Sequence, residues 1–363
     1  MLVDCDIHLG YDRPRRSRPV PRRTDARARR PLGVARPVDA LVPVESPDGL
    51  DPARCVCGRR RWRWFRLRRR SLARHAARPS PRPLCIDIGI VEPDEAAAFP
   101  ILPNAQLAAK LCTAYNDFLL ERWLQEEPRL RGMLVVPAQY PESAAQEIRR
   151  VGGRDEFVGV FLPGAARVPY GNPVYDPMWE ALDELALPVA VHMHFESVGI
   201  GGPVTAAGMP DYYVEYHTLC GSGMYGHFVS ILCHGIFERF PNTRLAMVEG
   251  GLVPFVGFLW RLDTNWKSCR NEIPWCRRPP SEYVWEHVRF ATQPLETPDD
   301  PELLVRAIEG LRPWDTLMFA SDFPHWDFDE PEQTLGLLPA EWREAVRSQN
   351  ACDFFRLPAP VRA

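Results

Sequence analysis

Short apolar runs recur along the chain, separated by amphipathic stretches. One run, at 317–320, is continuous from Leu317 to Ala320 and then stops at Ser321 and Asp322. A run of this length between polar residues is typical of a strand buried on both faces. Similar runs begin near residues 2, 85, 131, 157, 187, 244 and 288. The pattern therefore predicts eight strands.

The stretches between these runs have the spacing of helices. In 104–125, for example, Leu107, Leu111, Ala114 and Phe118 recur every three or four residues. The same pattern predicts helices at 141–151, 176–185, 211–240, 253–262, 301–309, 331–337 and 341–349. Strands that alternate with helices indicate an α/β protein with a parallel sheet, and eight such units predict a (β/α)₈ TIM barrel. An open doubly wound sheet is the alternative, although no glycine-rich phosphate loop follows the first strand.

Residues 11–83 break this pattern. They contain 22 Arg, no Lys and only 6 acidic residues, and from 12 to 83 they lack Ile, Asn, Gln, Lys, Met and Tyr. The missing residues have AT-leaning codons, so we interpret the segment as a frame-shifted stretch. A disordered basic arm and a folded insertion are the alternatives. The predicted organisation is a first strand at 1–10, this segment at 11–83, the rest of the barrel at 84–355 and a tail at 356–363.

Composition narrows the class of protein. Apolar residues make up 45% of the chain, which is enough for a large core. The net charge of −3 conceals +16 in residues 11–83, so the other 290 residues carry −19 and offer no basic face to nucleic acid. The ten Cys form no CxxC pair, and the sequence shows neither a secretory signal nor a transmembrane run. These features favour a cytoplasmic protein without a membrane partner.

Residue types that bind metals lie where several predicted strands end. They are Asp6 and His8 on the first strand, His192 and His194 on the fifth, Glu249 on the sixth and Asp322 on the eighth. The carboxyl ends of barrel strands share one face, where active sites lie. Carboxylate and imidazole are the usual ligands of Zn²⁺, Mn²⁺ and Fe²⁺, so the pattern predicts a divalent-metal site. For Asp322 taken alone, the alternative is a turn cap.

Four motifs resemble the amidohydrolase-related family, in the branch that contains aminocarboxymuconate-semialdehyde decarboxylase and aromatic-acid decarboxylases. They are DCDIH at 4–8, LPVAVH at 187–192, GIFERFP at 235–241 with EGG at 249–251, and FASDFPHWD at 319–327. The resemblance implies a metal-dependent barrel with one divalent metal, Zn²⁺ being preferred and Mn²⁺ or Fe²⁺ the alternatives. It implies four ligands, namely Asp6, His8, His192 and Asp322. Glu249 and His194 are further candidates for binding the metal or the substrate.

For such a site we expect a hydrolase acting on an amide, ester or ring C–N or C–O bond of a small-molecule substrate. The metal would lower the pKa of bound water toward about 7, and Asp322 would act as general base. The alternative is a metal-dependent decarboxylase of an aromatic or enoic acid. In that reaction His325, three residues after Asp322, is the best-placed acid, ahead of His194 and His234. An inactive chain, and nucleic-acid binding through 11–83, are further alternatives, and a homo-oligomer is left open.

Overall fold

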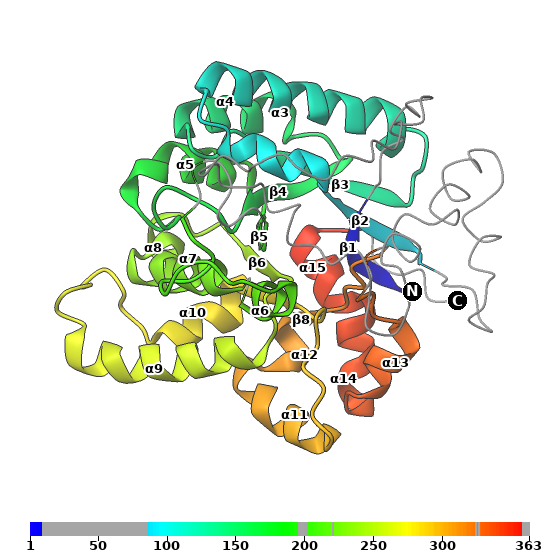
Figure 1. Ribbon diagram of the computed structural model, residues 1–363, viewed down its shortest axis with the longest axis vertical. Coiled ribbons are helices and arrows are strands. Elements are labelled where there is room, and N and C mark those ends of the chain that lie inside the picture. Colours follow the sequence, from blue (N-terminus) through cyan, green and yellow to red (C-terminus); the bar gives the residue numbers. More distant parts are fainter. Residues whose placement is uncertain are drawn as a thin grey trace, which may run out of the picture.

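A computed structural model describes residues 1–8, 86–194, 200, 202–219, 221–323, 325 and 327–357. Within these residues the chain forms one eight-stranded sheet with helices around it (Figure 1). The segment 11–83 and the tail beyond 357 lie outside the described residues. The frame-shift hypothesis and the proposed domain limits therefore remain predictions.

Eight parallel strands follow one another around the sheet in chain order. They are β1 (Val3–His8), β2 (Ile88–Glu92), β3 (Leu130–Val135), β4 (Phe157–Pro163), β5 (Val189–His192), β6 (Leu245–Val248), β7 (Val288–Ala291) and β8 (Leu317–Met318). Each strand pairs in parallel with the next. The predicted (β/α)₈ barrel is confirmed, and the sequential order excludes a doubly wound sheet, whose strand order reverses partway.

The barrel closes where β1 meets the chain beyond β8. The amide of Cys5 donates to the carbonyl of Phe319 at 3.0 Å, and the amide of His8 donates to that of Phe323 at 2.8 Å. β8 has only two residues in regular strand conformation, fewer than the predicted run. Beyond Met318 the backbone amides leave the regular ladder: that of Phe319 donates to the carbonyl of Val346 at 2.9 Å, and that of Ala320 donates to the hydroxyl of Thr292 at 3.1 Å.

Helices cover the outside of the barrel (Figure 1). They are α3 (Ala105–Leu119), α4 (Pro141–Val151), α5 (Asp176–Leu185), α6 (Tyr213–Leu219), α7 (Ser222–Cys233), α8 (Ile236–Arg239), α9 (Val253–Cys269), α10 (Pro280–His287), α11 (Pro301–Ile308), α12 (Pro313–Thr316), α13 (Pro331–Gly336), α14 (Ala340–Glu344) and α15 (Asn350–Phe355). All predicted helices are present, and 211–240 divides into α6, α7 and α8. The sequence did not reveal α10, α12 and α15, because helices of 8, 4 and 6 residues are too short to show clear periodicity. In the described part of the chain, no helix combines the length and apolarity that crossing a membrane requires.

The strands contribute alternate side chains to two apolar layers. In β5, Val189 and Val191 belong to the layer shared with the helices, whereas Ala190 belongs to an interior layer. α15 packs against the interior layer, and Arg244, which directly precedes β6, donates to the carbonyl of Asp353 in α15 at 3.1 Å. The helix α15 therefore closes the end where the strands begin, and the opposite end is left for polar side chains.

Candidate metal centre

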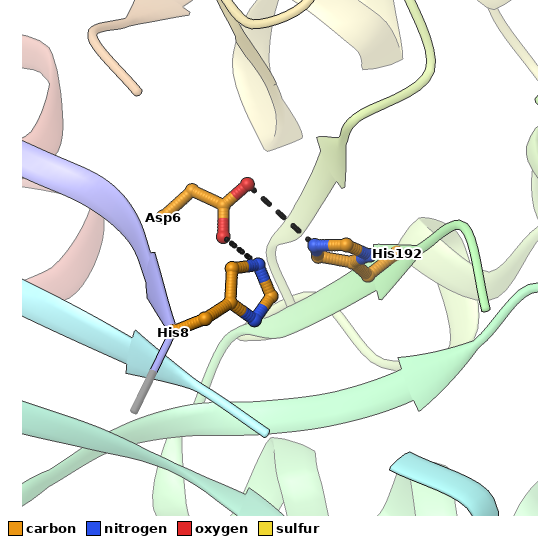
Figure 2. Close-up of side chains that lie close together, drawn as sticks. All are labelled: Asp6, His8 and His192. Atoms are coloured by element: carbon orange, nitrogen blue, oxygen red, sulfur yellow. Dashed lines mark ion pairs between the residues drawn. The ribbon is translucent and has the colours of Figure 1, made fainter. Parts of the chain in front are cut away.

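Four polar side chains meet at the carboxyl end of the barrel. Asp6 and His8 lie at the end of β1, His192 is the last residue of β5, and Asp322 follows β8. The Nε2 atom of His8 lies 3.0 Å from Oδ1 of Asp6 and 3.1 Å from Oδ1 of Asp322. The Nε2 atom of His192 lies 3.5 Å from Oδ2 of Asp6, which stands between the two imidazoles (Figure 2). The structure thus brings together the four residues expected to be ligands.

The atoms of this cluster fit a divalent cation. All four side chains are buried. Among the described residues, however, no hydrogen-bond partner exists for either oxygen of Asp6, either nitrogen of His8 or Nε2 of His192. Buried polar atoms without partners are costly, and such atoms call for a ligand. Ligand atoms bound to one ion at about 2.0–2.2 Å lie roughly 3–3.5 Å apart, which matches the measured separations.

The charges of the cluster determine its protonation. Burial alone would raise the pKa of Asp6, but the imidazoles of His8 and His192 hold it well below its usual range. Burial would lower the pKa of His8, but Asp6 and Asp322 raise it well above its usual value. Metal binding at this cluster therefore competes with protonation of His8.

Backbone and neighbouring groups orient the two imidazoles that follow β5. The Nδ1 atom of His192 lies 2.8 Å from the carbonyl of Met193, so it carries the proton and leaves the Nε2 lone pair facing Asp6. The Nδ1 atom of His194 lies 3.0 Å from Nδ1 of His192. Burial, together with His192, holds the pKa of His194 well below its usual value. His194 is therefore a neutral imidazole that contacts His192 on the side away from Asp6.

Two carboxylates of the site lie on strained backbone. Asp322 and Glu249 have φ values of 56° and 61°, in the left-handed region that residues other than glycine rarely adopt. Asp322 is fully buried, and its Oδ1 atom contacts Nδ1 of His325 at 2.5 Å in addition to His8. The side chain of His325 is 24% exposed. The pair therefore connects a buried carboxylate with solvent.

The structure adds four residues that the sequence did not single out. Glu92 ends β2 in register with His8, is 1% exposed, and has no hydrogen bond to either oxygen within the described residues. The Nε2 atoms of Gln293 and His217 lie 3.2 and 3.1 Å from Oδ2 of Asp327. Glu92 and Asp327 carried a signal, because one ends an apolar run and the other lies in the last motif. Gln293 and His217 carried none.

Two other features lie apart from this cluster. His234, considered as an acid, ends α7, and its Nδ1 atom lies 2.9 Å from the carbonyl of Ser230 in the same helix. A pocket of ≈ 200 Å³ opens between the chain segments that follow β4 and β5, and it is lined by Arg167, Val204 and His227 among others. None of the four cluster residues lines this pocket, so it is not the cavity around the metal centre.

Known proteins share this architecture. The Amidohydrolase family model matches residues 3–357. The gamma-resorcylate decarboxylase of Rhodococcus jostii is 25% identical over 279 residues, which cover 70% of this chain and 76% of that protein. The crystal structure of 2,6-dihydroxybenzoate decarboxylase from Rhizobium is 20% identical, with a TM-score of 0.58 over 75% of this chain and 84% of that chain. A dihydroxybenzoic acid decarboxylase from Polaromonas, solved with bound manganese, is 22% identical, with a TM-score of 0.58 over 77% and 83%.

The family match begins before Asp6 and ends after Asp322, so it encloses the whole cluster. It also agrees with the sequence motifs around the strand ends, which resemble the same family. The chain belongs to the amidohydrolase family, in the branch that contains these aromatic-acid decarboxylases.

Proposed function

We propose that this enzyme is a divalent-metal-dependent decarboxylase of a small hydroxylated aromatic acid. One observation carries the proposal. The buried ligand atoms of Asp6, His8 and His192 lack hydrogen bonds, and they adjoin a carboxylate, Asp322, that contacts a partly exposed imidazole. The decarboxylase relatives, two of them named for dihydroxylated benzoic acids, supply the class of substrate. They favour the alternative expectation over the hydrolase expected first.

Asp6, His8, His192 and Asp322 are the residues that would hold the cation. When bound, it supplies the positive charge that an anionic acid needs in a site otherwise lined by carboxylates. We propose Mn²⁺ in place of the Zn²⁺ expected first, since the Polaromonas relative was solved with manganese. A ligand set that is half carboxylate also suits Mn²⁺.

The reaction breaks the bond between the ring carbon and the carboxylate carbon. Carbon dioxide leaves without the bonding electrons, and the ring carbon that keeps them takes up one proton. In our proposal Asp322 carries that proton at its carboxylate, because it is the buried partner of the pair. His325, with its partly exposed side chain, then returns a proton from solvent to Asp322 through the contact between Nδ1 and Oδ1.

The same pair could serve hydrolysis by taking a proton from water, so geometry alone does not separate the two reactions. The test is incubation of the Mn²⁺-loaded enzyme with 2,6-dihydroxybenzoate and 5-carboxyvanillate, and separately with aryl esters and lactones. We expect metal-dependent release of CO₂ from at least one acid, with one deuterium entering the ring when the solvent is D₂O. Hydrolysis of the esters or lactones without any CO₂ from the acids would overturn the proposal.

A further inference from the structure

A second group of metal-binding side chains lies beside the first. It combines His217 from α6, Glu249 after β6 and Asp327 from the segment after β8. Each offers one ligand atom, and these three atoms lie within 4.8 Å of one another. We propose that His217, Glu249 and Asp327 bind a second divalent cation, in addition to the single cation expected from the sequence. This inference does not depend on the reaction that the enzyme catalyses.

The spacing of the ligand atoms supports such a site. The Nε2 atom of His217 lies 3.1 Å from Oδ2 of Asp327. Two ligands of one ion at about 2.0–2.2 Å are separated by roughly this distance. The three residues come from different parts of the barrel face, so the approach of their ligand atoms is set by the fold and not by local sequence. One imidazole and two carboxylates form a donor set that suits Mn²⁺ or Zn²⁺.

The environment of Glu249 also supports a second cation. Glu249 is 7% exposed. Among the described residues, its side chain forms one ion pair, at 3.5 Å between Oε2 and Nδ1 of His192, and that nitrogen is already directed at the carbonyl of Met193. A largely buried carboxylate with a single long contact is costly. The ligand atoms of His217 and Asp327 are close enough for one ion to bind all three residues and remove that cost.

The negative charge at the carboxyl end of the barrel, here called the barrel mouth, also supports a second cation. It contains Asp6, Glu92, Glu249, Asp322 and Asp327, and within the described residues none of these carboxylates forms an ion pair with Lys or Arg. A single divalent cation offsets only part of this negative charge. A second cation at Glu249 and Asp327 offsets more of it where the carboxylates are crowded.

A simple hydrogen bond between His217 and Asp327 is the competing explanation, and counting bound ions separates the two. Mn²⁺ is titrated into the metal-free protein while free Mn²⁺ is measured by its electron paramagnetic resonance signal. We expect about two equivalents per chain for the wild type, and about one for His217→Ala and for Asp327→Asn. The variant His234→Ala, which removes an imidazole elsewhere, should bind as the wild type does. His8→Ala should lose the other equivalent and keep the one at His217.

The affinity for the second Mn²⁺ equivalent gives a quantitative test besides the count of bound ions. Loss of the His217 imidazole should weaken binding of the second equivalent by at least about tenfold while the first is unchanged. If the wild type binds a single equivalent at saturation, or if His217→Ala and Asp327→Asn bind two equivalents with wild-type affinity, the second site does not exist. Activity is not needed for this measurement, so a failed decarboxylation assay would leave the result intact.

Hydrogen exchange adds a readout that is specific for α6. No side chain of this helix is fully buried, and the contact of His217 with Asp327 ties α6 to the barrel. Binding of the second equivalent should slow amide exchange across 213–219 in the wild type and leave it unchanged in His217→Ala. Exchange in α6 that does not respond to the second equivalent would contradict the proposed ligand His217.

Discussion

Asp4 accepts two hydrogen bonds from Ser321, a residue 317 positions later in the chain. The backbone amide of Ser321 donates to Oδ1 at 3.0 Å, and its hydroxyl donates to Oδ2 at 2.5 Å. Both residues are buried, and Asp322 follows directly with its backbone in the left-handed region. The first strand thus determines where the carboxylate of Asp322 lies after the last strand.

Replacing Ser321 with alanine should therefore destabilise the barrel. The change leaves one oxygen of the buried Asp4 without its donor, at a cost of about 1–3 kcal/mol in the free energy of unfolding. Urea denaturation of the metal-free protein measures this cost. Ser321→Thr keeps the hydroxyl and should recover a large part of the lost stability. Equal stability of the wild type and Ser321→Ala would show that the bond contributes nothing.

The two imidazoles after β5 should differ in their effect on metal binding. His192 directs its Nε2 atom at Asp6, whereas Nδ1 of His194 contacts the far side of His192. We expect His192→Ala to lose the equivalent held by the Asp6 cluster, and His194→Ala to keep it with affinity reduced about 10–100-fold. Elemental analysis after equilibrium dialysis distinguishes these results. The assignment is wrong if His192→Ala retains the full metal content.

His325 should matter for catalysis without holding the metal. Its replacement by alanine removes the partly exposed partner of Asp322, so turnover of the acid substrate should fall by about 10²–10⁴. Metal content should stay at the wild-type level. The matched control is His234→Ala, whose imidazole bonds within α7 and should leave turnover unchanged. Similar turnover in His325→Ala and the wild type would exclude this role.

Stability should depend on pH through His227. Its Nδ1 atom accepts the amide hydrogen of Tyr170 at 3.2 Å, and its Nε2–H donates to the carbonyl of Gly164 at 2.8 Å, so the ring is held neutral. Burial lowers the pKa from 6.5 to about 4, against the effect of the Gly164 bond. The unfolded chain therefore binds a proton first as the pH falls, and stability present above pH 6.5 is lost between 6.5 and about 4.

The loss should be on the order of 3 kcal/mol at the acid end of this range. Urea denaturation at pH 7.5, 6, 5 and 4 gives the curve, and His227→Gln is the control. Glutamine can replace both hydrogen bonds but does not titrate, so the difference between the two curves isolates the imidazole. Parallel curves would mean that His227 does not titrate as described.

The strand positions were predictable because strands of a parallel barrel are buried on both faces and appear as apolar runs. The clustering of Asp6, His8, His192 and Asp322 was predictable for a related reason, since each lies at the end of such a run or directly after it. That rule also applies to Glu92, which ends the second run. His217 was not predictable, because it lies on a helix without fully buried side chains and reaches Asp327 only through the packing of distant segments.

The type of reaction was not predictable from the ligands either. Two carboxylates and two imidazoles can support hydrolysis or decarboxylation, and they can bind several metals. What separates these outcomes is the shape and polarity of the surroundings, which depend on side chains such as Glu92 and Gln293. Glu92, for example, is placed beside the cluster by strand register, through its pairing with His8, and not by any motif.

The hydrogen bonds between Asp4 and Ser321, which join the first and last strands, also affect the order in which the site forms during synthesis. Asp6 and His8 leave the ribosome early, but Asp322 and the carbonyls of Phe319 and Phe323 that complete their surroundings are translated more than three hundred residues later. The nascent chain therefore cannot assemble the full ligand set until its last strand has emerged. Loading of the proposed metal would consequently be a late step, and a ribosome that stalls before residue 317 would leave an open barrel with an incomplete centre.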